Sequence, residues 1–588
     1  MQIQRLPISF ISIIVKIMKI LLAIIMPFIT LGQNTSIGGW KNYKSYNSAS
    51  YVCEANNKIY CVASGSLFYV EKNDKIITRL SKIDGLSDIE IEHIGFLEET
   101  NTLIIIYKNC NIDLIKDGYI TNLSDIKRKE IVGKKQINNI IIKNKKVYIS
   151  SSFGLIILDT ERQEIQDTYK IGLNAEFQEI TGCTFINDSI LVTTSLGVFY
   201  ADANSNSLFD YNSWDTLTNF LQDDIFENIV SSESVFLIDS TDEINNINYY
   251  NNTFLISKDS CVEIYSSDFI LQHILKTPEI VNALYSYKDS DNNIWIADGV
   301  NGLLKYVNFN YYSSYIPEGP ISNNIFSVEY IDNKLYVCHG GHTNFGNWWN
   351  KEGGSVMSEN MFWENYNYEE LGQCRDIVSV TKNGESVYWA SYYNGISEFK
   401  NGELYERWSP NNTGFALDTI DDWQNDKRIS VASLKFDNNG NMWGVTSSVT
   451  NPLFVKTPEN EWHSFYLPQQ IKYLYSDLII DNNDQKWIII GRDGGANEIG
   501  VLVYSDNGTI SNTADDQYKI LTTSIGNGKL PSLNVYSITE DLNGEIWIGT
   551  DKGICVFYNP SYVFSTYNFD AEQILIQEGD YGQYLLSE

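Results

Sequence analysis

Two strands and two turns are encoded in one short stretch of this sequence, Asp541-Leu-Asn-Gly-Glu-Ile-Trp-Ile-Gly-Thr-Asp-Lys-Gly-Ile-Cys-Val-Phe557. Its Asn-Gly pair favours a tight turn because both residues tolerate positive φ. Ile546 and Ile548 alternate with Trp547, as in a strand that presents a different set of side chains on each face. Gly553 then ends a polar turn that leads into a second apolar run. The stretch predicts an antiparallel hairpin.

Degenerate copies of this hairpin recur along the chain, and most begin about 45 residues apart. They lie at residues 58–68, 103–115, 146–158, 189–200, 294–306, 334–338, 387–399, 441–446, 486–504 and 541–557, with weaker strands between 235 and 265. The period fits the four short strands of a propeller blade and exceeds that of a leucine-rich repeat. Helical patterning is almost absent, which excludes helical solenoids. The sequence therefore predicts an all-β protein built from β-propellers.

The number of repeats requires more than one ring, because about twelve blades exceed the four to eight of a single propeller. We expect two consecutive propellers, residues 34–320 and 321–588, with a seam near Tyr315-Ile-Pro-Glu-Gly-Pro320. The first ring then holds the clear repeats and a cryptic one within 205–260, and a strand over 40–46 would complete its last blade. We expect the second ring to be truncated. Closure by strand exchange with another subunit is the alternative.

Residues 1–33 carry Lys16 and Lys19 before an apolar run, the pattern of a cleaved signal peptide. No later run is long enough for a membrane helix, so we expect an exported protein without a transmembrane segment. The formal net charge of −32 argues against nucleic-acid binding. The same acidity also fits simple solubility of a large surface.

A local excess of basic residues lies between Lys108 and Lys146, which contains ten Lys and Arg residues but only four acidic residues. This stretch would suit an anionic polymer or a partner protein, although a solvated loop explains it equally simply. The candidate contacts are Lys127, Arg128, Lys129, Lys134 and Lys135.

Two adjacent tryptophans, Trp348 and Trp349, lie in a glycine-rich stretch between Gly341 and Gly354 that we expect to be a long loop. Exposed indoles on a propeller face suit stacking against sugars, and packing inside or between the rings is the alternative. The two tryptophans complete the set of candidate ligand contacts.

The sequence contains no complete motif for catalysis, metal binding or cofactor binding. His339 and His342 form a close pair without a visible third ligand, and the Asp-rich turns lack the glycine and glutamate of a calcium-binding EF-hand loop. The eight cysteines include no C-x-x-C pair, and we expect them to be free and buried. We therefore expect no cofactor and no metal, and the sequence selects no glycosidase pair among its many carboxylates.

Residues 543–554 resemble the repeats of two-component regulator propellers. A narrower resemblance lies in Leu80-Ser-Lys-Ile-Asp-Gly-Leu-Ser-Asp88, Asn111-Ile-Asp-Leu114, Gly154-Leu-Ile-Ile-Leu-Asp159 and Ile574-Leu-Ile-Gln-Glu-Gly-Asp-Tyr-Gly-Gln583. These motifs are similar to the PorZ family, accessory components of the type IX secretion system of Bacteroidetes.

The PorZ resemblance implies two seven-bladed propellers followed by a C-terminal sorting β-sandwich, which we expect to be absent from this sequence. It implies a location in the periplasm or at the outer-membrane cell surface. It also implies a non-enzymatic role in an attachment complex there, with a PorU-like sortase and PorV- and PorQ-like proteins as partners. In that role the family binds anionic lipopolysaccharide and presents it for attachment to secreted cargo. Two alternatives stay open, a glycan-sensing ectodomain of a hybrid two-component regulator and a propeller lyase or glycosidase.

Overall fold

A computed structural model describes residues 40–588 apart from 73–74, 132, 172–177, 218–225, 232–234, 240–243, 251, 344–345, 422–426, 468–474, 492–499, 566–567, 579–580 and 587–588. The expected signal peptide lies outside the described residues. Within the described part of the chain, no helix is long and apolar enough to cross a membrane.

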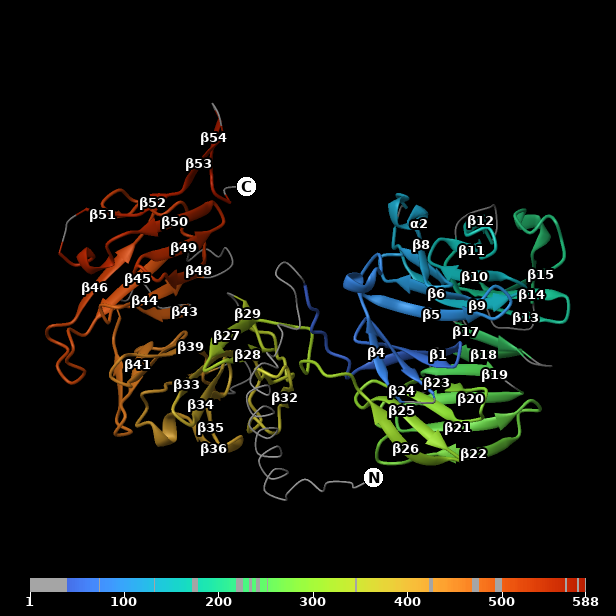
Figure 1. The fold of residues 1–588 in the computed structure, drawn as a ribbon, viewed down its shortest axis with the longest axis horizontal. Coiled ribbons are helices and arrows are strands. Elements are labelled where there is room, and N and C mark those ends of the chain that lie inside the picture. The colour runs from blue at the N-terminus through green and yellow to red at the C-terminus, as the bar shows by residue number, and fades with distance from the viewer. Residues whose placement is uncertain are drawn as a thin grey trace, which may run out of the picture.

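Seven antiparallel sheets follow one another between residues 49 and 315 (Figure 1). Their strands are β1 (Ala49–Ala55), β2 (Lys58–Ala63), β3 (Ser66–Glu71), β4 (Ile77–Leu80); β5 (Ile91–Leu97), β6 (Thr102–Tyr107), β7 (Ile112–Lys116), β8 (Tyr119–Leu123); β9 (Ile137–Lys143), β10 (Lys146–Ser151), β11 (Gly154–Asp159), β12 (Glu164–Tyr169); β13 (Ile180–Ile186), β14 (Ser189–Thr194), β15 (Gly197–Asp202), β16 (Asp215–Thr216); β17 (Phe226–Ser231), β18 (Val235–Asp239); β19 (Asn246–Tyr250), β20 (Thr253–Lys258), β21 (Cys261–Ser266), β22 (Leu271–Leu275); and β23 (Ala283–Lys288), β24 (Ile294–Asp298), β25 (Gly302–Val307), β26 (Asn310–Tyr315). The sheet of β17 and β18 lies inside the stretch where a cryptic repeat was predicted, which confirms that prediction.

The first strands of these sheets contact one another in a closed circle, because β23 of the last sheet also packs against β1. Tyr51 on β1 stacks on Tyr285 on β23, with ring centroids 4.0 Å apart. The ammonium group of Lys72 joins the same two sheets, lying 2.8 Å from a Glu54 carboxylate oxygen and 3.5 Å from Asp289. The first seven sheets therefore form a closed β-propeller.

The predicted strand over residues 40–46 is wrong, since residues 40–47 form no strand. The outer edges of the first and last sheets are already occupied by their own fourth strands, β4 and β26. The segment instead contacts the connection to the next propeller. The backbone N–H of Ser45 donates to Asn323 Oδ1 (2.9 Å), and Tyr43 lies 5.8 Å from Trp363 between ring centroids.

A second series of sheets runs from residue 327 onward and is yellow to red in Figure 1. Its four-stranded sheets are β27 (Ser327–Ile331), β28 (Lys334–Cys338), β31 (Gly354–Met357), β32 (Trp363–Tyr366); β33 (Ile377–Asn383), β34 (Ser386–Ser391), β35 (Gly395–Lys400), β36 (Glu403–Trp408); β39 (Val431–Phe436), β40 (Met442–Thr446), β41 (Leu453–Lys456), β42 (Trp462–Phe465); β43 (Tyr475–Ile480), β44 (Lys486–Ile490), β45 (Gly500–Ser505), β46 (Gln517–Leu521); and β48 (Val535–Glu540), β49 (Ile546–Thr550), β50 (Gly553–Phe557), β52 (Glu572–Gln573). Short pairs accompany them: β29 (His342–Thr343) with β30 (Gly346–Asn347), β37 (Ile420–Asp421) with β38 (Lys427–Arg428), β47 (Asn527–Gly528) with β51 (Phe569–Asp570), and β53 (Leu575–Glu578) with β54 (Tyr581–Tyr584).

Helical structure within the described residues is confined to short turns between the sheets. These are helix α2 (Asp125–Arg128) and the 3-10 turns Lys82–Asp84, Tyr211–Ser213, Pro410–Asn412 and Pro560–Tyr562. The predicted all-β propeller class is therefore confirmed.

The repeated Asp and Trp of the hairpin motif form one hydrogen-bonded unit. In the hairpin of β49 and β50, the Asp541 carboxylate accepts from the backbone N–H of Asn543 (2.9 Å) and Glu545 (3.0 Å) and from the Trp547 indole (3.2 Å). The same arrangement joins Asp289 to Trp295, Asp437 to Trp443 and Asp481 to Trp487. These aspartates therefore organise turns, which confirms the hairpin interpretation over the calcium interpretation.

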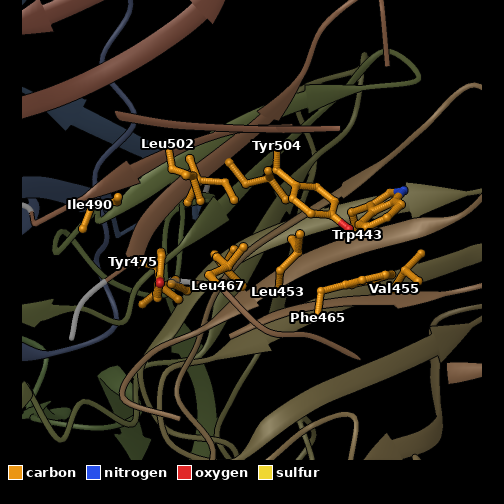
Figure 2. Packing of buried hydrophobic residues seen from close by; sticks show 14 of the residues in the cluster. Trp443, Leu453, Val455, Phe465, Leu467, Tyr475, Ile490, Leu502 and Tyr504 are labelled. Carbon is orange, nitrogen blue, oxygen red and sulfur yellow. The ribbon is translucent and has the colours of Figure 1, made fainter. Parts of the chain in front are cut away.

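The hydrophobic core lies between neighbouring sheets, and Figure 2 shows one such layer. Trp443 from one sheet lies there beside Tyr504 from the next, with ring centroids 6.3 Å apart, and Tyr475 and Leu502 belong to the same cluster. Burying a large aromatic side chain removes roughly 150–250 Å² of surface from water. Each Å² of apolar surface buried stabilises the fold by about 25 cal/mol. Burial of the Trp443 indole therefore ties its own sheet to the following one.

Candidate ligand-binding site

The predicted basic residues lie in the loop between β8 and β9, which begins with helix α2. Lys127 forms a 2.6 Å ion pair with Asp88 on the preceding loop. Burial opposes ionisation of Asp88, but hydrogen bonds from Lys127 and Asn109 outweigh it and lower the carboxyl pKa to about 2. Lys127 is thus already used to hold two loops together.

The other four basic candidates divide into two groups. Lys135 donates to the backbone carbonyls of Lys127 (2.6 Å) and Lys129 (2.8 Å), so its charge stabilises the carboxyl end of α2. Arg128, Lys129 and Lys134 are all exposed. The Arg128 guanidinium lies 3.8 Å from the Asp125 carboxylate. Exposed positive charge is therefore carried mainly by Arg128, Lys129 and Lys134.

The two candidate tryptophans lie between β28 and β31, on a loop anchored by the buried carboxylate of Asp376. That carboxylate accepts from the backbone N–H of Trp349 (3.1 Å) and Asn350 (2.9 Å) and from Asn347 Nδ2 (3.2 Å). Trp349 has φ +63°, a left-handed conformation that is strained for a bulky residue. The hydrogen bonds to Asp376 maintain this conformation.

Trp349 presents its ring beside two residues that the sequence analysis missed. Its indole is 44% exposed and lies 5.1 Å from the Tyr393 ring. The Arg375 guanidinium lies 5.5 Å from the Trp349 ring and 5.7 Å from the Tyr393 ring. We call Trp349, Arg375 and Tyr393 the aromatic–arginine site.

Trp348 points to a different surface from its neighbour. It is 52% exposed and meets Phe326 edge to face at 5.9 Å. Its ring covers Gly341, where an added Cβ would approach within 2.0 Å. The two tryptophans are therefore adjacent in sequence but do not form one joint stacking platform.

A second arginine supports the same loop. Arg428 Nη1 donates to Asn347 Oδ1 (3.1 Å), and the Arg428 Nε atom is buried without a hydrogen-bond partner among the described residues. Asn347 in turn donates to the Tyr392 carbonyl (2.7 Å). Arg375 and Tyr393 come from loops of the neighbouring sheet, and Arg428 comes from β38. No local sequence signal therefore places Arg375 and Tyr393 beside Trp349 or Arg428 beside Asn347.

The histidine pair serves packing rather than ligation. His339 makes hydrogen bonds through both ring nitrogens, Nδ1 to the Asn324 carbonyl (2.7 Å) and Nε2 to Ser355 Oγ (2.9 Å). The His342 ring stacks on Tyr392 at 3.9 Å. Across the described residues, no group of three His, Cys, Asp or Glu side chains is arranged to hold a metal ion. All eight cysteines are free thiols, as predicted, and all but the half-buried Cys261 are buried.

Much of the first propeller matches a known protein family. Residues 59–215 match the family model described as the PorZ N-terminal β-propeller domain of the type IX secretion system. This part of the chain is similar to the N-terminal propeller of PorZ. Residues 529–552, which include the Asp541 turn, match the two-component regulator propeller repeat. No curated protein matches the chain.

Solved structures agree with the PorZ match at the level of fold. PorZ from Porphyromonas gingivalis, described as an essential bacterial surface component of the type IX secretion system, superposes with a TM-score of 0.79 at 23% identity, covering 93% of this chain and 77% of that chain. An ancestral GH74 enzyme reaches a TM-score of 0.57 at 10% identity, covering 92% of this chain and 84% of that chain. The PorZ-like arrangement thus extends over both propellers.

Proposed function

We propose that this protein is a non-enzymatic component of a type IX secretion attachment complex, which binds anionic lipopolysaccharide and presents it to a PorU-like sortase. PorV- and PorQ-like outer-membrane proteins would hold the complex at the cell surface. The match of residues 59–215 to the PorZ propeller domain carries the proposal. The two-propeller fold shared with PorZ supports it.

The aromatic–arginine site supplies chemistry suited to an anionic sugar. The exposed Trp349 ring offers a stacking face, and the Arg375 guanidinium beside it supplies a positive charge with several donors. A planar guanidinium can donate two parallel hydrogen bonds to a carboxylate or phosphate. The exposed residues Arg128, Lys129 and Lys134 of the first propeller would add electrostatic attraction along a longer polymer.

Binding to purified lipopolysaccharide tests the proposal. We expect the full chain to bind lipopolysaccharide that carries an anionic polysaccharide and to bind a neutral counterpart at least about tenfold more weakly, with affinity falling as salt rises. Trp349→Ala and Arg375→Gln should each weaken binding about tenfold or more, because stacking and the charged hydrogen bonds are lost.

Matched variants elsewhere control for exposure and charge. Trp40→Ala removes an indole that is 83% exposed, and Arg162→Gln removes an exposed arginine from a turn of the first propeller. Neither should change affinity by more than about twofold. Equal binding of the anionic and neutral forms by the unaltered protein would contradict the proposal.

A glycan-sensing ectodomain is the second candidate, because residues 529–552 match the regulator repeat. This function predicts a preference for a neutral oligosaccharide over the anionic lipopolysaccharide in the same assay. It would use the Trp349 stacking face without Arg375, so Trp349→Ala alone should weaken binding.

A further inference from the structure

A cavity of about 520 Å³ lies inside the first propeller, among the innermost strands of five sheets. Five tyrosines line it: Tyr51 from β1, Tyr249 and Tyr250 from β19, and Tyr285 and Tyr287 from β23. A second hollow of about 410 Å³ shares Glu54, Phe96, Glu98, Tyr250 and Tyr287 with it. The two hollows therefore adjoin, and we call them together the tyrosine channel.

The channel opens at the end of the propeller opposite the basic loop. Its mouth is formed by turns that join the first and second strands, such as Asn56 and Asn57 after β1 and Glu98 to Asn101 after β5. The loop with Lys127 to Lys135 instead leads from a fourth strand into the next first strand. Because neighbouring strands are antiparallel, these two kinds of connection lie at opposite ends.

The tyrosine rings of the channel are electron-rich, and burial opposes ionisation of Tyr51, Tyr285 and Tyr287. Burial raises the pKa of Tyr51 to about 12, and burial together with a hydrogen bond to Tyr250 raises the pKa of Tyr287 further above its usual value. The rings of Tyr250 and Tyr287 lie 5.1 Å apart at an angle of 32°. The wall thus offers aromatic faces and protonated hydroxyl groups.

Carboxylates lie at the channel mouth, and the described residues that line the two hollows include no Lys or Arg. Glu54 is already engaged, because it accepts from Lys72 Nζ (2.8 Å) and from the backbone N–H of Ser290 (2.7 Å). Glu98 and Glu99 are exposed on the turn after β5. Lys288, which follows Tyr287 on β23, donates to Thr253 Oγ1 (2.9 Å) and does not line the cavity.

We propose that the tyrosine channel binds a lysine or arginine side chain from an extended segment of a partner protein. The apolar stem of such a side chain fits between tyrosine rings, while its charged end is attracted to aromatic faces and carboxylates. Glu98 and Glu99 would repel an anionic polymer at this mouth. The site is therefore distinct in chemistry and position from the aromatic–arginine site of the second propeller.

Titration of the full chain with short capped peptides tests this inference. The probe is Ac-Gly-Gly-Lys-Gly-Gly-NH2, compared with the same peptide carrying glutamine, and cadaverine serves as a free diamine. We expect the lysine peptide to bind at least about fivefold more tightly than the glutamine peptide. Tighter binding of cadaverine than of the lysine peptide, or equal binding of the two peptides, would overturn the assignment to a protein side chain.

Paired variants locate the binding. Glu98→Gln and Tyr287→Leu should each weaken binding of the lysine peptide about fivefold. The control variants Glu161→Gln and Tyr119→Leu, at exposed positions of the same propeller, should change the affinity for this peptide less than about twofold. Glu98 lies on an exposed turn, so its variant keeps the test valid even if Tyr287→Leu impairs folding. An equal loss in Glu161→Gln would assign the binding to general attraction by the net charge of −32 and overturn the proposal.

Discussion

The last four-stranded sheets of the two propellers carry the same aspartate–tryptophan pair in different surroundings. In the first propeller, the Trp295 indole donates to Asp289 (2.9 Å) and is fully buried against Val52 and Phe68 of the first sheet. In the second, the Trp547 indole donates to its aspartate at 3.2 Å but stays partly exposed.

The first sheets of the two propellers also differ in how far their first strands are buried by another sheet. Tyr51 on β1 stacks on the last sheet of its ring, whereas Val328 and Tyr330 on β27 are 54% and 70% exposed. The turn chemistry of the hairpin therefore depends only on its own residues. Burial of the indole requires a second sheet to pack against it, so the same motif contributes to stability according to its neighbour.

Replacing the two tryptophans should separate these contributions most strongly. Trp295→Ala leaves a cavity at the closure of the first ring and should lower the free energy of unfolding by about 3–5 kcal/mol. Trp547→Ala should cost less than about 2 kcal/mol, because water already reaches part of the ring. Urea denaturation followed by circular dichroism measures both, and equal losses would break the comparison.

Lys72 gives a polar test of ring closure. Its side chain is 3% exposed and lies among Glu54, Asp289 and Asp291, so Lys72→Met would leave buried carboxylates without their cation. We expect a loss of about 3 kcal/mol in the stability of the first propeller. Lys145→Met breaks an exposed ion pair with Glu161 and should cost under about 1 kcal/mol. A small loss in the Lys72 variant would show that the apolar contacts close the ring alone.

The sequence predicted the repeating elements well because each hairpin is a local structure. Asn-Gly turns and alternating apolar residues act over a few positions, and weak strand patterns together with the spacing indicated the cryptic repeat within residues 205–260. The prediction of a strand over residues 40–46 was wrong. A segment can add to the edge of a sheet only where no strand already pairs, and β4 and β26 already pair at the outer edges of the first and last sheets. The sequence named Trp349 as a candidate contact and left its exposure open, and Arg375 and Tyr393 reach it only through packing between sheets.

Histidine protonation should produce a smaller, pH-dependent effect in the first propeller. Burial lowers the pKa of His93 from 6.5 to about 4 in the folded state, outweighing a hydrogen bond to the Ile137 carbonyl. The unfolded chain therefore binds the proton first, and stability should fall as pH drops from about 6.5 to about 4. His93→Phe should flatten this decline in urea midpoints measured between pH 7.5 and 5. An unchanged slope would assign the acid sensitivity to other groups, such as His339 in the second propeller, whose pKa burial also lowers.

Cargo modification in cells tests the central proposal most directly. The measurement is the fraction of a secreted cargo protein that carries lipopolysaccharide, seen as slower migration on an immunoblot, after the chromosomal gene is replaced by the Trp349→Ala, Arg375→Gln double variant. With the variant present at normal levels, the account predicts that cargo accumulates without lipopolysaccharide, while the Trp40→Ala control modifies it normally. Normal cargo modification by the double variant would contradict the proposed role of the aromatic–arginine site.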